Sequence, residues 1–109
     1  MLALRIDITG FVDDSQPGWV ELRLVDAAGV THVFIEKVPV VSDLALDRNS
    51  RYPQPGVLAC TLVERSIGDD GNLRLIVDTA RPWGVSSLDD ETRFVVRPDQ
   101  TLELAHADA

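Results

Sequence analysis

Two segments of the chain place aromatic side chains beside proline and arginine. Tyr52 begins a proline-rich segment that includes Pro55, and Arg81 precedes Trp83 by two residues. Tyr, Trp and Arg are the residue types most enriched at the contacts that dominate protein–protein binding. If both segments are loops at one end of a small β domain, they form one patch. We therefore take Tyr52, Pro55, Arg81 and Trp83 as the candidate partner-binding residues.

The position of the Trp83 side chain can also be interpreted in a second way. Large aromatic side chains usually bury most of their area, so Trp83 could fold back and plug the mouth of a barrel. Proline and glycine on either side of it would then only shape the loop. Both interpretations predict an ordered loop.

His32 is the candidate for acid–base chemistry, because histidine changes charge near neutral pH. Glu21, Asp78 or Cys60 could act with it. This motivates an alternative function, a small-ligand or hydrolytic β-barrel that uses His32 and nearby carboxylates. The predicted strand register, however, puts His32 on the same face as Phe34, which favours a packed residue. The chain has no G-x-S-x-G, H-E-x-x-H, phosphate-loop or dinucleotide-binding motif, so we assign no catalytic residue and no cofactor.

Acidic residues cluster at two places, residues 69–72 (DDGN) and 89–91 (DDE). Carboxylate oxygens are ligands for calcium and magnesium. Neither cluster has the alternate acidic positions and distal Glu of a calcium loop. The single cysteine, Cys60, excludes an intramolecular disulfide and a multi-cysteine metal site. We predict solvated turns and no metal.

The balance of charge is acidic. The 109 residues carry 18 Asp and Glu against 10 Lys and Arg, a formal net charge of −8. Sequence-independent binding to phosphates needs a basic face, so nucleic acid is disfavoured as a partner. An OB-type binder of single-stranded nucleic acid, using stacked aromatic rings, is kept as a further alternative. An acidic surface suits a basic protein partner.

Three features favour a cytoplasmic protein. The N-terminal segment MLALRIDITG is too short and too charged for a signal peptide, and no apolar run approaches the length of a membrane span. A lone cysteine also suits a reducing compartment. We therefore expect no membrane association.

The segment 19–41 predicts a β-hairpin. Its apolar and polar residues alternate on both sides of the sequence DAAG, which is typical of a type I turn with a G1 bulge. This turn sets Leu22 opposite Phe34 and Leu24 opposite His32. Pro39 interrupts the second strand. Ser42 could cap a short helix near residues 42–48, or Leu44 and Leu46 could alternate in a short strand.

Period-two alternation predicts the remaining strands. The first begins at Leu2, with a bulge or bend expected at Gly10. The strand at 57–65 is apolar on both faces, so we expect it to be central and covered on both sides. Further strands are expected at 73–79, 92–97 and 102–104.

These elements define an all-β chain, with about six to seven strands and at most one short helix. We expect a small antiparallel barrel or sandwich. The element order is similar to that of an OB-type barrel. We expect a single β domain over residues 1–105, with residues 106–109 as a frayed tail. Free strand edges near Pro39 make a homodimer an alternative. The favoured function is a non-enzymatic protein-binding or regulatory module.

Overall fold

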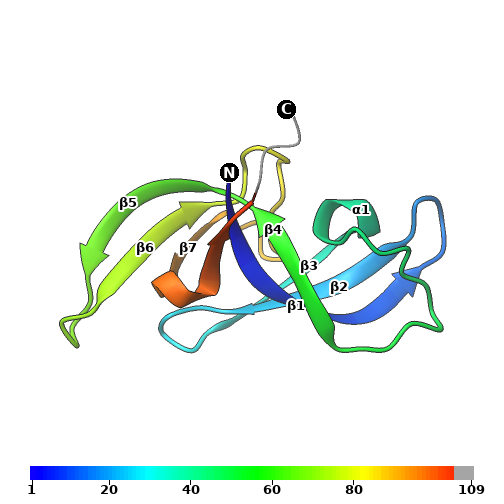
Figure 1. Cartoon of the computed structure of the whole chain (residues 1–109), viewed down its shortest axis with the longest axis horizontal. Helices are drawn as coiled ribbons and strands as arrows, with labels where there is room; N and C mark the ends of the chain where they lie inside the picture. Colours follow the sequence, from blue (N-terminus) through cyan, green and yellow to red (C-terminus); the bar gives the residue numbers. More distant parts are fainter. Residues whose placement is uncertain (105–109) are drawn as a thin grey trace.

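The computed structural model describes residues 1–104, which form eight strands and one short α-helix (Figure 1). The predicted all-β class is confirmed. The predicted frayed tail, residues 106–109, lies outside the described residues. The strands form two antiparallel sheets that do not close into a barrel, which corrects the barrel alternative of the predicted fold. The larger sheet has the order β3 (Thr31–Lys37), β2 (Trp19–Val25), β1 (Leu2–Asp13), β4 (Gln54–Ala59), with β8 (Thr101–Glu103) paired to β1. The smaller sheet has the order β5 (Thr61–Ile67), β6 (Leu73–Asp78), β7 (Arg93–Val96).

Strand β1 is the centre of the larger sheet, because it pairs with β2, β4 and β8. Its side chains alternate as predicted, with Leu4, Ile6 and Ile8 buried in the core. The register between β1 and β2 shifts between Ile8 and Gly10, which confirms the predicted irregularity at Gly10.

The β2–β3 hairpin has the predicted register, with Leu22 opposite Phe34 and Leu24 opposite His32. Its turn also has the predicted geometry. Gly29 adopts a φ of 83° and its N–H donates to the Asp26 carbonyl oxygen at 3.0 Å. Glycine takes this left-handed conformation without the steric cost that a Cβ would add.

The predicted strand 57–65 is divided at Cys60. Strand β4 ends at Ala59 in the larger sheet and β5 begins at Thr61 in the smaller one, while the N–H of Cys60 donates to the Leu2 carbonyl oxygen at 2.9 Å. The prediction of a strand covered on both sides is wrong for β5, which is an edge strand with Val63 41% exposed. A chain that crosses between packed sheets buries apolar residues on both sides of the crossing, and this pattern is the same as that of a doubly covered strand.

The short helix lies earlier than predicted, at α1 (Val38–Val41). Pro39 is in its first turn, where the fixed φ of proline suits a helix and its missing N–H has no helical partner. Val38 and Val41 are buried. Residues 42–48 form neither a helix nor a strand, and the Oγ of Ser42 accepts the N–H of Leu44 at 3.1 Å in a local turn.

The core lies between the two sheets. Phe34 of β3 meets Phe94 of β7 edge to face, with ring centroids 5.6 Å apart. Val77 and Val96 of the smaller sheet are fully buried in the same cluster. Within residues 1–104, no helix is long and apolar enough to cross a membrane.

Candidate functional site

The loop over residues 79–92, between β6 and β7, is held in place by a buried threonine. Thr79 has no exposed surface, and its Oγ1 donates to the carbonyl oxygens of Val85 at 2.7 Å and Thr92 at 3.3 Å. Its backbone N–H also donates to the Thr92 carbonyl at 2.8 Å, and the Val85 N–H donates to the Thr79 carbonyl at 3.0 Å. These bonds join the two ends of the loop and fix its middle.

A buried serine holds the second half of the loop. The Oγ of Ser87 accepts the backbone N–H groups of Asp89 at 3.3 Å and Glu91 at 3.1 Å. The Ser87 N–H donates to the Glu91 carbonyl oxygen at 2.8 Å. Within residues 1–104, Thr79 and Ser87 are the two buried polar residues. Both are used to order this one loop.

Two large apolar side chains point outward from the ordered loop. Trp83 is 60% exposed, next to exposed Arg81, so the structure does not place it as a plug over the core. The turn behind it is closed by the N–H of Gly84, which donates to the Ala80 carbonyl oxygen at 2.9 Å. Leu88 is 61% exposed, and its N–H donates to the Val33 carbonyl oxygen at 2.8 Å on the edge of β3.

The segment that leads into β4, which includes Tyr52, lies in a different part of the structure from this loop. The segment that precedes β4 is at the lower right of Figure 1, whereas the yellow loop between β6 and β7 is at the upper centre. Tyr52 packs against the core and its OH donates to the Asp47 carbonyl oxygen at 2.7 Å. Pro55 is exposed on β4 opposite Asp7. The expected single patch of Tyr52, Pro55, Arg81 and Trp83 is therefore not formed.

His32 is enclosed by groups that the sequence analysis did not select. Its Nε2 lies 2.8 Å from Asp26 Oδ2, and its Nδ1 lies 3.6 Å from Glu91 Oε2. Its ring meets Phe94 edge to face at 4.8 Å, and its side chain is 11% exposed. The arrangement connects the hairpin turn, through Asp26, to the end of the loop, through Glu91.

Asp26 carries a perturbed carboxyl group. Burial alone would raise its pKa, but hydrogen bonds from His32 and from the backbone N–H groups of Val30 and Ala28 outweigh burial and hold the pKa below its usual value. A signal for this pair was present in the sequence, because an Asp that opens a hairpin turn lies close to the start of the returning strand.

The partners that sequence analysis offered for His32 have other roles. Glu21 Oε1 accepts the hydroxyl of Thr9 at 2.6 Å, and Asp78 Oδ1 accepts the N–H of Ala80 at 2.8 Å. Cys60 is buried, and burial raises the pKa of its thiol to about 11. A thiol in this state is a poor nucleophile at neutral pH.

The acidic turns are also engaged locally. Asp70 accepts Arg74 Nη2 at 2.7 Å and the N–H of Asn72 at 3.0 Å. The backbone hydrogen bond from Asn72, followed by the side-chain bond from Arg74, lowers the pKa of the Asp70 carboxyl. In the described part of the chain, no three His, Cys, Asp or Glu side chains are grouped as a metal site.

Comparison with protein-family models, with curated proteins and with solved structures finds no match. The fold and the site define an all-β domain with an ordered loop that presents a tryptophan.

Proposed function

We propose that the chain is a non-enzymatic protein-binding module and that residues 79–92, here called the docking loop, form its binding surface. The observation that carries this proposal is the use of buried Thr79 and Ser87 to fix a loop on which Trp83 and Leu88 stay exposed. Burying a polar side chain is unfavourable unless it is hydrogen-bonded. A preformed loop loses little conformational entropy on binding, which favours affinity.

Trp83 is the central contact in this proposal. Tryptophan combines a large apolar surface with an N–H donor, and it is among the residues whose truncation most weakens interfaces. A partner therefore needs an apolar pocket that accepts an indole ring. Arg81 lies beside Trp83 at the rim of the contact.

The charge of the loop indicates the chemistry of the partner. Asp89, Asp90 and Glu91 follow Leu88 and are exposed, in a chain with a net charge of −8. A basic partner surface complements them, and such complementarity mainly raises the association rate at low salt. We therefore propose a basic protein surface around an apolar pocket.

The hydrolytic alternative has less support. Both ring nitrogens of His32 face carboxylates, Asp26 at 2.8 Å and Glu91 at 3.6 Å, and Phe94 lies against the ring. The His32 side chain therefore connects the hairpin turn at Asp26 to the docking loop at Glu91. The nucleic-acid alternative is disfavoured by the net charge of −8.

A homodimer is also less favoured. The edge of β3, which leads to Pro39, is engaged by the N–H of Leu88, which donates to the Val33 carbonyl oxygen at 2.8 Å. The free edge of β5 is the other candidate. A two-fold antiparallel pairing about the middle of β5 would oppose two Glu64 side chains. If the two-fold axis of the pairing lay at the next residue instead, two Arg65 side chains would lie opposite each other. Like charges directly opposite each other destabilise strand pairing. The bulge in β5 between Leu62 and Glu64 further disturbs this edge.

Affinity capture from the native host tests the proposal. The immobilised chain is expected to retain a stoichiometric partner, and Trp83→Ala and Leu88→Ala are expected to lose it. Leu44→Ala is the matched control, because Leu44 is 61% exposed, like Leu88, but lies on another loop. Undiminished capture by both docking-loop variants would contradict the proposal.

A further inference from the structure

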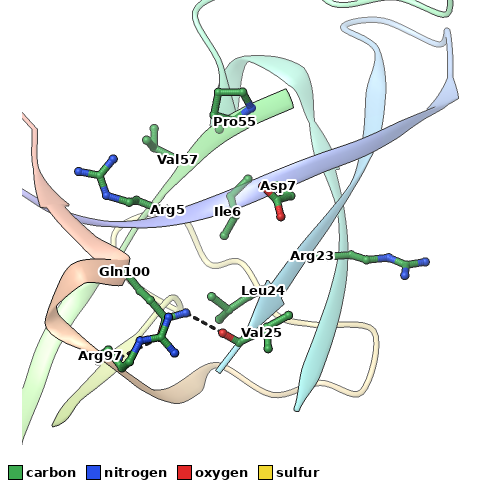
Figure 2. A pocket seen from close by; sticks show the side chains of 11 residues that line it. Arg5, Ile6, Asp7, Arg23, Leu24, Val25, Pro55, Val57, Arg97 and Gln100 are labelled. Atoms are coloured by element: carbon green, nitrogen blue, oxygen red, sulfur yellow. Dashed lines mark hydrogen bonds between the residues drawn. The ribbon is translucent and has the colours of Figure 1, made fainter. Parts of the chain in front are cut away.

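A groove opens where β1 and β2 part from each other. Their pairing ends at Asp7 and Arg23, and β8 covers only Leu2 to Leu4 on the same edge of β1. Among residues 1–104, no strand pairs with the edge of β1 between these two pairings. Figure 2 shows the side chain of Gln100 reaching across the gap, where its Nε2 donates to the Val25 carbonyl oxygen at 2.6 Å. A side chain here replaces the missing strand pairing.

The groove is apolar at its base and of a size suited to a small molecule. Its volume is about 480 Å³, within the range of ligand pockets, roughly 300–1,000 Å³. Its accessible apolar surface comes from Val25, which is 49% exposed, and from the half-buried Val57, while Ile6 and Leu24 are buried beneath it. An aliphatic chain placed here would remove apolar surface from water on both partners.

Two guanidinium groups lie on one side of this groove. Figure 2 shows Arg5 and Arg97 on the side of Gln100, whereas Arg23 extends away on the other side. Arg5 has no ion-pair partner among residues 1–104. Arg97 Nε pairs with Asp99 Oδ1 at 3.1 Å, but the Asp99 side chain is 76% exposed. Exposed pairs of this kind are weak, so Arg97 can exchange its partner.

We propose that this groove binds an amphipathic carboxylate, a small molecule with one carboxylate head and an aliphatic body. Arg5 and Arg97 hold the head, because the planar guanidinium matches a carboxylate with paired hydrogen bonds. The body lies on Val25 and Val57. Asp7 lines the groove away from Arg5 and Arg97 (Figure 2) and repels the head, which sets the orientation.

The concentration of arginine supports an anionic ligand. Arg5 and Arg97 are two of only 10 Lys and Arg residues in a chain with a net charge of −8. The groove shares no residue with the docking loop. Carboxylate binding and partner binding can therefore be tested separately.

Titration of the isotopically labelled chain with sodium octanoate, followed by amide NMR shifts and calorimetry, tests the proposal. Saturable shifts are expected at the amides of Ile6, Leu24 and Gln100. 1-Octanol, which lacks the charge, and inorganic phosphate, which lacks the aliphatic body, should each bind at least about tenfold more weakly, since charge-assisted hydrogen bonds and apolar burial each contribute that much.

Variants locate the site. Arg5→Gln and Arg97→Gln should each weaken octanoate binding about tenfold, and Asp99→Asn should strengthen it by releasing Arg97. Arg48→Gln is the control, because Arg48 is an exposed arginine that pairs with Asp14 at 2.9 Å. Unchanged melting temperatures would show that the variants are folded. No saturable shift, equal binding of octanol or of phosphate, or wild-type affinity in both Arg5→Gln and Arg97→Gln would each overturn the proposal.

Discussion

His32 Nε2 lies 2.8 Å from Asp26 Oδ2, where the β2–β3 hairpin meets the docking loop. The other carboxyl oxygen of Asp26 accepts the N–H groups of Ala28 at 2.9 Å and Val30 at 3.0 Å. On the far side of the imidazole, Glu91 of the docking loop lies 3.6 Å from Nδ1. One carboxylate therefore orders the hairpin turn and, through His32, supports the end of the loop that carries Trp83.

This relationship predicts the acid dependence of stability. The folded-state pKa of Asp26 is below its unfolded value, which is about 3.9, so its ionised form stabilises the fold above that pH. The contribution is lost as the pH falls through the folded-state pKa. Asp26→Asn should therefore lower the free energy of unfolding at pH 5 and flatten its decline in more acidic buffer. Urea unfolding across a pH series measures this. Exposed Asp43 provides the control as Asp43→Asn, and parallel curves for Asp26→Asn and wild type would contradict the account.

Thr79→Val should destabilise both the fold and the loop. It keeps the shape of the side chain but removes the donor to the Val85 carbonyl oxygen, which is 2.7 Å away in the interior. Leaving a buried polar group unsatisfied costs about 1–3 kcal/mol. Urea unfolding should show this loss, and hydrogen exchange should become faster at Gly84 and Val85. Thr79→Ser should retain most of the stability. Thr61→Val, at an exposed threonine whose contact to the Asp78 carbonyl is 3.4 Å, should change little. A Thr79→Val chain as stable as wild type would show that the hydroxyl does not order the loop.

Gly56→Ala tests the packing beneath the groove. A Cβ at Gly56 would lie 2.7 Å from Ile8 Cδ1 and 2.9 Å from Ile6 Cδ1. Both isoleucines are buried, so they have little room to move. Overpacking of this kind costs about 1–3 kcal/mol. Gly10→Ala is the matched control on β1, because no neighbouring atom lies within 4 Å of its added Cβ. Thermal unfolding should separate the two variants, and equal stability would show that the core around Gly56 adapts.

Cys60 should be protected from alkylation in the folded chain. It is 2% exposed, and burial raises its thiol pKa to about 11. The reactive thiolate is therefore scarce at pH 8 and is also shielded. Iodoacetamide labelling, followed by mass spectrometry, should be slow in buffer and complete in urea above the unfolding transition. Labelling at the rate of a free thiol in the native chain would contradict this burial.

Local chemistry made some elements predictable. The hairpin register could be read because Asp26 and Gly29 specify the turn and the alternating side chains specify the faces. Other elements depend on tertiary context. The segment Val38–Val41 has a strand-like composition, yet Pro39 begins a helical turn that packs two valines into the core. The division at Cys60 was hidden, because apolar residues on both sides of it pack into the core of different sheets.

The site was predictable only in part. The residue types of Arg81 and Trp83 led to the prediction of a binding loop, which stays a prediction, and to the expectation of an ordered loop, which the hydrogen bonds of Thr79 and Ser87 confirm. Whether Trp83 is exposed depends on hydrogen bonds from Thr79 and Ser87, which no sequence pattern shows. The groove beside Arg5 could not be predicted either, because it arises where two strands diverge and residues far along the chain, Arg97 and Gln100, come to lie beside them.

The affinity of the purified partner for wild type and for Trp83→Ala, measured by calorimetry, tests the central claim most directly. Truncation of a dominant interface residue costs about 2 kcal/mol or more, so Trp83→Ala should weaken binding at least about 30-fold. Leu44→Ala should bind within about twofold of wild type. If Trp83→Ala binds as tightly as wild type, the docking loop is not the surface that holds the partner.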